Sequence, residues 1–404
     1  GQDLVLRWLA PEKDGLAGMD STMGKCSADA ARLMHRRRNA NECFGACNKD
    51  DNPWQLSGGD IKWYTDWLAV RGVNLFIPHA FYYSIRGKRK DERPPDVGPH
   101  SIWWAHYEAW STYWRRLSWL MTDIDLHAKV AVLCRNRDLC PDTVHPLFER
   151  QIGFQYIPES YFPACTVEDS ALCLHGHRYT AVLGDKALFP DAAHPELSVL
   201  EPDCRCDPPQ PMLRCASFNK EGRACWLLVN EGNTPIRTRL TLPVDAPLCR
   251  YDLWNGQPCA CPAEHTAQGA CLPLELPARG SLLLFTCTAQ ETETLPLPPT
   301  YLSLPVPDFI LVEEDATRAA KTYRAVLQVA AADIEAATPL LTLRGQEMAE
   351  LTVNGQPAGV SFWSPHKFPL AGLLTPGENT LTLTLTGSPA NRYGNHPVPY
   401  GLER

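Results

Sequence analysis

The order of apolar segments in residues 1–125 is the feature that most constrains the fold of this chain. Residues 27–38 and 58–71 place apolar side chains at helical spacing, and residues 101–122 form a long aromatic helical pattern. The short segment 39–45 is strand-like, and the continuous apolar run 73–78 is typical of a buried parallel strand. Alternation of this kind predicts an α/β architecture with parallel strands.

The second of these helices also carries signals at its ends. Asp60 follows two glycines and is predicted to be the N-cap of the helix, because a short polar side chain there accepts a hydrogen bond from a free backbone N–H. Gly72 follows the last apolar residue and is predicted to cap its C-terminal end.

Residues 126–200 alternate in the same way. Apolar runs at 127–133, 154–157 and 179–183 are predicted strands, and residues 143–153 have a helical pattern. We expect this stretch to form a small open α/β domain.

The chain changes to a β pattern after residues 201–211, which are rich in proline and aspartate. Short strands are predicted with turn signals between them, and this spacing favours a small β-sandwich. Residues 289–307 contain many prolines and threonines, and this composition predicts a linker. Further strands follow it, with Asn354-Gly355 as a hairpin turn. The predicted strands of both regions are 224–230, 237–242, 249–254, 281–287, 325–330, 340–343, 349–353 and 380–386.

Length and charge bound the number of domains and the kinds of partner. At roughly 150 residues per domain, 404 residues suggest two to four domains. The net charge of −8 argues against a nucleic-acid partner, which would need a basic face. No stretch approaches the ~20 apolar residues that span a bilayer, so no membrane association is predicted. The chain opens on Gly1-Gln2-Asp3 without a signal peptide, and we expect it to be a piece of a longer protein.

The 16 cysteines allow three interpretations. Free, mostly buried thiols in a reducing cytosol are favoured, because a chain of this size can build a core without disulfides. Scattered disulfides are the second reading and a metal site is the third. Cys204-x-Cys206 and Cys259-x-Cys261 lack the CxxC spacing of a zinc site. Location is otherwise undetermined, with the cytoplasm favoured.

Residues 41–46 (NECFGA) and 72–84 (GVNLFIPHAFYYS) resemble the end of the catalytic barrel in large modular bacterial glycoside hydrolases of the rhamnosidase-like and family-2-like kinds. Residues 130–133 and 146–148 are similar to the glutamine-amidotransferase-like domain that follows the barrel. Three later segments resemble the next, small β-domain, and three more resemble a family-2 sugar-binding jelly roll. These six segments are 228–231, 251–256, 276–281, 353–355, 377–379 and 400–402.

The resemblance implies a multidomain α/β plus β fold in a fixed order. Residues 1–125 would be the C-terminal part of a (β/α)8 (TIM) barrel, and 126–205 a non-catalytic amidotransferase-like α/β domain, in which Cys134 lacks a catalytic setting. Residues 206–290 would be a small β-sandwich, 291–310 a linker, and 311–404 a galactose-binding-like jelly roll. It also implies a carbohydrate substrate. Some relatives use calcium, but no oxygen-rich loop places it here, so no cofactor is predicted.

Glu42 is the residue on which the resemblance places catalysis. Glycoside hydrolysis needs two carboxyl groups flanking the scissile bond. Glu42 stands at a strand end, and active sites of parallel barrels lie at that end, so it would be the strand-seven nucleophile or general base. Its acid partner should come from strand four, upstream of residue 1. Asp20 and Asp29 are the nearest acids considered, and neither ends a strand. We expect the partner to lie in a missing N-terminal part of the same enzyme.

Substrate contacts are predicted on the segments beyond the last barrel strand. The candidates are one histidine that could hydrogen-bond sugar hydroxyls and four rings that could stack on a pyranose, although each could instead be core packing. They are His79, Tyr82, Tyr83, Trp103 and Trp104. The rings at helical spacing, Tyr107, Trp110, Trp114 and Trp119, are assigned to packing, and His106 and Glu108 to the helix surface. Trp363 and His366 could touch sugar in the jelly roll, or that domain could bind nothing.

Three functions therefore remain in order of preference. The first is a glycosidase acting on a polysaccharide or oligosaccharide. The second is a non-catalytic carbohydrate-binding remnant that lacks the acid carboxylate, and the third is a purely structural piece. A second carboxylate about 5–10 Å from Glu42 is the feature that discriminates between them.

Overall fold

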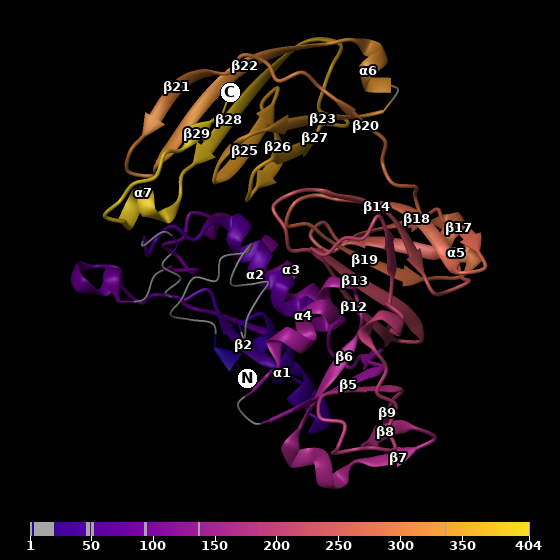
Figure 1. Ribbon diagram of the computed structural model, residues 1–404. Helices are drawn as coiled ribbons and strands as arrows, with labels where there is room; N and C mark the ends of the chain where they lie inside the picture. The colour runs from indigo at the N-terminus through magenta and orange to yellow at the C-terminus, as the bar shows by residue number, and fades with distance from the viewer. Residues whose placement is uncertain are drawn as a thin grey trace.

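The fold is a succession of α/β and β layers, seen in a computed structural model (Figure 1). It describes residues 2–3, 20–45, 49, 52–92, 95–135, 138–335 and 337–403, with the backbone alone at residues 2, 3 and 20. The N-terminal helices lie centrally, the C-terminal β-sheets lie above them in orange and yellow, and the magenta strands lie below. The coarse prediction of mixed α/β and β structure is confirmed.

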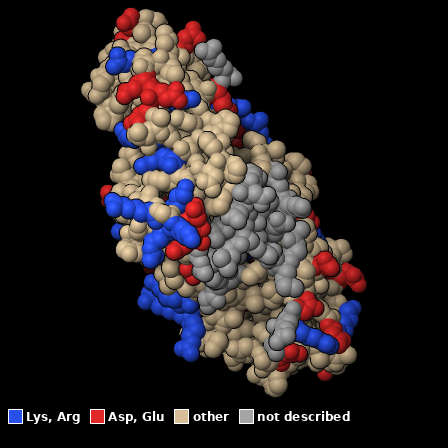
Figure 2. Space-filling view, turned by 90° about the vertical axis from the view of Figure 1, so that its left-hand side faces the viewer, with Lys and Arg blue, Asp and Glu red and all other residues tan. Residues whose placement is uncertain are grey.

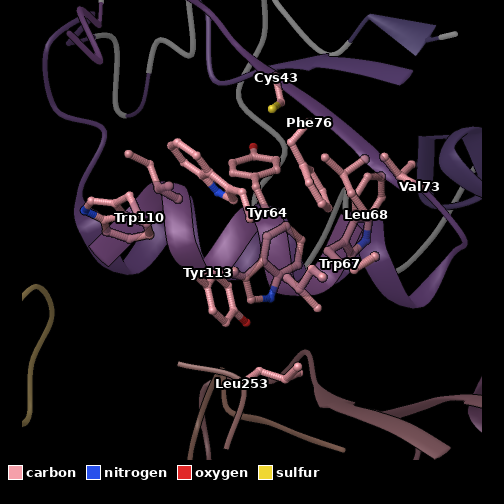
Figure 3. Close-up of a cluster of buried hydrophobic side chains, with 14 of the residues drawn as sticks. Cys43, Tyr64, Trp67, Leu68, Val73, Phe76, Trp110, Tyr113 and Leu253 are labelled. Carbon is pink, nitrogen blue, oxygen red and sulfur yellow. The ribbon is translucent and has the colours of Figure 1, made fainter. Parts of the chain in front are cut away.

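A three-stranded parallel sheet forms the first layer, in the order β1 (Gln2–Asp3), β2 (Ala40–Cys43), β3 (Leu75–Pro78). Helices α2 (Gly58–Val70) and α3 (Tyr107–Leu120) cover one face of it. Cys43 and Phe76 point from the sheet toward the ring layer of these helices, and Leu253 closes the cluster from the far side (Figure 3). The predicted alternation of helix and strand is confirmed here.

The opposite face of this sheet is open among the described residues. Leu75 is 37% exposed and Ile77 is 48% exposed, so the expectation of a strand buried on both faces is wrong for β3. The physical reason is that the described helices cover only one face of the sheet. Alternate residues of β3 point to opposite faces, and the described helices pack on the face that carries Phe76.

The start of α2 differs by three residues from the predicted cap. The N-cap is Ser57, whose hydroxyl accepts the N–H of Asp60, while the carboxylate of Asp60 accepts the N–H of Ser57. Asp60 is therefore the third helical residue of a capping box and not the cap itself. At the other end the cap is Arg71, and Gly72 follows it with φ of +100°, a conformation that favours glycine.

Two other helices have shifted bounds. Helix α1 spans Asp20–Leu33, so it starts before the predicted segment 27–38 and ends before its basic run, which is exposed. The aromatic segment 101–122 opens with turns and the short 3-10 helix η2 (Trp104–His106) before α3 begins. A further 3-10 turn, η1, spans Gly87–Asp91.

A second parallel sheet has the order β10 (Ala181–Leu183), β5 (Val130–Cys134), β6 (Phe154–Pro158), with α4 (Pro141–Glu149) against it. A small antiparallel sheet joins β7 (Thr166–Glu168), β8 (Ala171–Leu174) and β9 (His177–Tyr179). The single predicted strand 179–183 is wrong, because its two halves pair in different sheets: β9 with β8 and β10 with β5. The remaining 3-10 turns are η3 (Glu159–Ala164) and η4 (Leu197–Val199).

Two sheets, formed by strands between residues 205 and 286 together with β4, share one core. The first has the order β11 (Arg205–Asp207), β14 (Ile236–Leu242), β18 (Gly269–Leu276), β17 (Glu264–Thr266). The second has the order β16 (Gln257–Cys261), β15 (Leu248–Asp252), β19 (Ser281–Thr286), β13 (Arg223–Asn230), β12 (Leu213–Lys220), β4 (Asp125–Leu126). Leu228 and Leu284 face the first sheet, whereas Leu227 and Leu283 face α2 and α3. The six-stranded sheet is therefore covered on both faces.

The C-terminal strands form layers that are antiparallel except for the parallel pair of β20 and β23, over a separate core. A five-stranded sheet has the order β21 (Ile310–Asp315), β22 (Ala320–Val329), β28 (Gly377–Thr386), β25 (Met348–Val353), β26 (Gln356–Ser361). Beside it lie β20 (Tyr301–Ser303), β23 (Thr338–Leu343) and β27 (His366–Pro369), and the pair β24 (Gly345–Gln346) and β29 (Gly401–Leu402). The predicted hairpin turn is confirmed, with positive φ at Asn354 and Gly355 between β25 and β26.

Short helices complete the chain. They are α5 (Ala289–Thr294), α6 (Ala331–Glu335) and α7 (Pro389–Tyr393). The predicted linker 291–310 thus holds part of α5 and all of β20, so this stretch is structured. The cysteines among the described residues are free thiols, as expected, and none of the described helices is long and apolar enough to cross a membrane.

Candidate functional site

Glu42 lies near the C-terminal end of β2, on the open face of the first sheet. Its neighbour Cys43 is 1% exposed and packs against the helices. Because successive residues of a strand point to opposite faces, the Glu42 carboxylate points away from α2 and α3. It is partly exposed, and Ile77 of β3 is its partner in register.

The strand register also brings an unexpected acidic residue beside Glu42. In the parallel pairing of β1 with β2, the backbone of Asp3 is the partner of Glu42. Sequence reasoning missed Asp3 because β1 is only two residues long and has no strand pattern of its own. Of the acids it did consider, Asp20 begins α1, and Asp29 is fully buried and bound to Lys25, Arg32 and the Tyr156 N–H.

Next to Glu42, Asn41 carries a buried amide without a partner. It is 0% exposed, and neither its Oδ1 nor its Nδ2 has a hydrogen bond within the described part of the chain. An unpaired buried amide costs free energy, and by strand alternation this one lies on the covered face with Cys43, opposite the Glu42 carboxylate.

His79 sits where the prediction placed it, directly after β3. Its backbone N–H donates to the Cys43 carbonyl at 2.8 Å, which holds it at the shared end of β2 and β3. The Nδ1 atom of its partly buried ring has no hydrogen-bond partner among the described residues. This nitrogen is itself buried, so it is a polar atom without a hydrogen bond inside the described structure.

Two exposed rings, Phe81 and Trp104, and the partly buried ring of Tyr107 lie together beyond β3. The Trp104 ring, 40% exposed, has its centroid 5.6 Å from Phe81 and 5.2 Å from Tyr107. Phe81 is 54% exposed and was not predicted, although it belongs to the same aromatic run as the candidates Tyr82 and Tyr83. Exposed rings in contact form a surface on which the apolar face of a sugar can stack.

The other aromatic candidates are separated from this group. Tyr83 is 85% exposed, with the Arg89 guanidinium 5.1 Å from its ring centre. Tyr82 is partly buried, with its ring edge-on to Trp54 at 6.2 Å. Trp103 is 1% exposed and lies in the core against Trp110, so its assignment to substrate binding is wrong, because no ligand can reach its ring.

An aspartate–histidine pair on the loop after β3 was not predicted. The Asp96 carboxylate is fully buried, accepts the Gly98 N–H at 2.5 Å and makes a short contact with Nδ1 of His100. The His100 side chain is 30% exposed, and its ring is bound to Asp96 through Nδ1. A carboxylate that orients an imidazole in this way suits proton transfer. The only signal in the sequence was the four-residue spacing, which is common in loops.

Of the α3 residues that were assigned to core packing or to the helix surface, some lie where they were assigned and others do not. Trp110 and Trp114 lie in the core as predicted, but Trp119 is 57% exposed, so its assignment to packing is wrong. It points to the other side of α3 from Trp110 and Trp114. His106 does not simply face solvent, since its Nε2 lies 2.9 Å from the Glu350 carboxylate of β25.

The two candidates of the C-terminal strands, Trp363 and His366, also differ in whether a ligand can reach them. His366 is fully buried, with its ring bonded to Ser361 Oγ at 2.9 Å and to the Gly345 carbonyl at 3.0 Å. Burial lowers the pKa of His366 to about 4, so it is a neutral structural residue and the sugar contact is ruled out. Trp363 does line a cleft of about 1270 Å³ between α2, the β15–β16 turn and the C-terminal strands, together with the 47% exposed Tyr301.

Metal ligands do not gather anywhere in the described residues. No group of three or more histidine, cysteine, aspartate or glutamate side chains there is positioned to hold an ion. On the face shown in Figure 2, basic and acidic side chains lie in groups that adjoin one another in several places, among neutral residues.

Comparison with known proteins gives a fold likeness without a sequence family. The sequence matches no protein family, and no curated protein matches it. Its structure is similar to a rhamnosidase from Novosphingobium sp. PP1Y, with a TM-score of 0.70 and 14% identity. That match covers 96% of this chain and 47% of the rhamnosidase, so this chain spans about half of that protein's length.

Two β-galactosidases are also similar over part of the chain. One, a GH42 enzyme from G. stearothermophilus, has a TM-score of 0.40 and 10% identity over 70% of this chain and 59% of that one. The other, from Bacillus circulans sp. alkalophilus, has a TM-score of 0.37 and 12% identity over 70% and 60%. The rhamnosidase likeness carries the conclusion that the chain has a glycoside hydrolase-like fold.

Proposed function

We propose that this chain, with its glycoside hydrolase-like fold, carries part or all of a glycosidase active site centred on Glu42. The observation that carries the proposal is the position of Glu42, at the C-terminal end of a parallel strand on the open face of the sheet. Active sites of parallel barrels are built at that end. Glu42 is the proposed nucleophile or general base, and residues 1–125 the proposed end of the barrel.

Asp3 is the proposed second acid. Adjacent parallel strands lie about 4.8 Å apart, and the two carboxyl groups of a glycosidase lie about 5–10 Å apart. The register of Asp3 with Glu42 supports this assignment at the level of the backbone. It stands as an alternative to the expectation that the acid partner lies in a missing N-terminal part of the same enzyme.

The residues beyond β3 are proposed to bind the sugar. His79 offers an unpaired ring nitrogen, and Trp104 with Phe81 offers an exposed apolar surface. Tyr82 and Tyr83 lie on the same segment and remain proposed contacts. The substrate class is an oligosaccharide or polysaccharide, hydrolysed at an O-glycosidic bond.

The later parts of the chain are proposed to follow the family order. Residues 126–205 would be an amidotransferase-like scaffold, 206–290 a β-sandwich and 311–404 a galactose-binding-like jelly roll. Two sheets with a shared core between 205 and 286, and the antiparallel layers after residue 310, support this division.

A panel of 4-nitrophenyl glycosides tests the proposal. It includes the α-L-rhamnopyranoside and the β-D-galactopyranoside, because the similar structures are a rhamnosidase and β-galactosidases. We expect release of 4-nitrophenolate from at least one member, and loss of that release in Glu42→Gln and Asp3→Asn. Release that persists in both variants would overturn the assignment.

A second candidate function rests on the cleft lined by Trp363 and Tyr301. It would make the chain a carbohydrate-binding unit without catalysis. If no panel member is cleaved but a soluble polysaccharide retards the chain in a native gel, and Tyr301→Ala abolishes that retardation, this second function is favoured.

A further inference from the structure

A cavity of about 510 Å³ lies between α3 and the six-stranded sheet, outside the site described above. Its floor is apolar and is formed by the sheet side chains Cys225, Leu283 and Phe285, with Tyr251 and Leu253 beside them. Its wall is the outer side of α3, including Trp119. This size and this apolar lining are typical of small-molecule sites, which hold about 300–1,000 Å³.

The helix pattern explains why the cavity exists. Trp110, Tyr113 and Leu117 face the core, so α3 turns the stripe of Thr112, Arg116 and Trp119 the other way. These residues recur every three or four positions and stand over the sheet without filling the space above it. Phe285 and Leu283 alternate with Leu284 and Leu282 along β19, which places them on the side facing α3.

Basic side chains outnumber acidic ones in the lining of the cavity. Arg115, Arg116 and Lys220 line it and make no ion pair within the described residues, whereas Arg223 is paired with Glu291 outside the lining at 2.5 Å. Glu221 is the one acidic residue of the lining. The protein as a whole has a net charge of −8, so a surplus of cations at an apolar cavity is a local feature.

Two of these cations are held in place by backbone carbonyls. Arg116 Nη1 donates to the carbonyl of Leu253 at 3.0 Å, and Lys220 Nζ donates to the carbonyls of Trp119 at 3.1 Å and Thr122 at 2.6 Å. Lys220 also lies 4.6 Å from the centre of the Trp119 ring. The positive rim is therefore positioned before any ligand arrives, which lowers the entropic cost of binding.

We propose that this cavity is a second ligand site, which takes a small, flat, apolar anion such as an aromatic carboxylate. The apolar floor and Trp119 accept the ring, and the unpaired cations at the rim attract the carboxylate. The site is separate from Glu42, because the core face of α3 and the covered face of the first sheet lie between the two.

Calorimetric titration of the whole chain with 2-naphthoate tests the proposal. We expect saturable binding that weakens at least tenfold in Trp119→Ala and in Arg115→Glu, two exposed positions where substitution leaves the core intact. The neutral probe 2-naphthol should bind more weakly than 2-naphthoate. Arg318→Glu, the same charge change at an exposed turn outside the cavity, should leave binding unchanged.

Three results would overturn it. They are the absence of saturable 2-naphthoate binding, binding that both cavity variants retain, and equal weakening by Arg318→Glu. Circular dichroism of each variant separates loss of binding from loss of fold. Because Glu42→Gln should bind 2-naphthoate like the parent chain, the outcome is independent of the proposed hydrolysis.

Discussion

Arg71 and Glu231 form an ion pair whose two side chains are both 0% exposed. Arg71 is the C-cap of α2, and Glu231 follows directly after β13. Arg214 shares the same carboxylate, with its Nε 3.1 Å from Oε2. The pair ties the N-terminal helices to the six-stranded sheet, so the first sheet and its Glu42 are anchored through α2 to the layers that follow.

Removing that carboxylate should destabilise the protein strongly. Glu231→Gln leaves two arginines buried without a counter-charge, and breaking a buried pair costs about 3–5 kcal/mol. Urea unfolding followed by tryptophan fluorescence measures the loss. Glu275→Gln is the control, because its pair with Arg237 is 67–77% exposed and should contribute at most about 1 kcal/mol. Equal losses in the two variants would contradict this account.

Glu347 should make the contact between α2 and the C-terminal strands sensitive to pH. Burial, and after it the Asp60 carboxylate, raises the pKa of Glu347 from 4.5 to about 8, against the opposing effects of Lys49 and the Gly58 N–H. The folded protein thus holds a proton that the unfolded chain releases between these values. Its contribution to stability is present below pH 4.5 and is lost as the pH rises through about 8.

Glu347→Gln removes that titration. Compared with the parent chain, the variant should gain stability steadily as the pH is raised from 5 to 8, and melting temperatures across this range measure it. Parallel pH profiles for variant and parent would show that the carboxyl does not titrate as described.

Gly58 should resist substitution although it lies in a helix. Replacing glycine by alanine inside a helix stabilises by roughly 0.5–1 kcal/mol when there is room. At Gly58 an added Cβ would lie 2.3 Å from the Phe362 carbonyl oxygen, so Gly58→Ala must push α2 from the C-terminal strands. At Gly24 of α1 the nearest atom would be an ordinary 3.5 Å away. Thermal melts should move down for Gly58→Ala and up for Gly24→Ala, and a rise in both would contradict the packing.

Removing the buried amide of Asn41 should stabilise the protein. Its amide is buried without a partner in the described chain, and such a group costs about 1–3 kcal/mol. Asn41→Val fits a strand and removes that cost, so the melting temperature should rise, while any glycosidase turnover should be kept because the side chain lies on the face of β2 opposite the Glu42 carboxylate. A fall in melting temperature would show that the amide is satisfied in the folded protein.

Periodicity in the sequence predicts elements better than it predicts partners. The apolar run 73–78 identified a strand, but only the packing of α2 and α3 decides that Phe76 is covered while Ile77 is open. Helical spacing placed Trp110 and Trp119 on one helix, yet their faces differ, because spacing does not show which side meets the core.

The candidate site was predicted only where it lies on a strand. Glu42 and His79 follow strand signals, and they lie near the end of β2 and directly after β3. Asp3 depends on the pairing of a two-residue strand with a segment some forty residues later, and the Asp96–His100 pair depends on how a proline-rich loop folds back. Neither relation leaves a local pattern in the sequence.

The kcat/KM of Glu42→Gln on the best 4-nitrophenyl glycoside tests the central claim most directly. We expect a loss of at least about a hundredfold, the order of the contribution of a positioned acid or base, with the melting temperature unchanged. Glu108→Gln, an exposed glutamate of α3, should keep the parent rate. A Glu42→Gln variant that turns over at the parent rate would contradict the assignment of this active site.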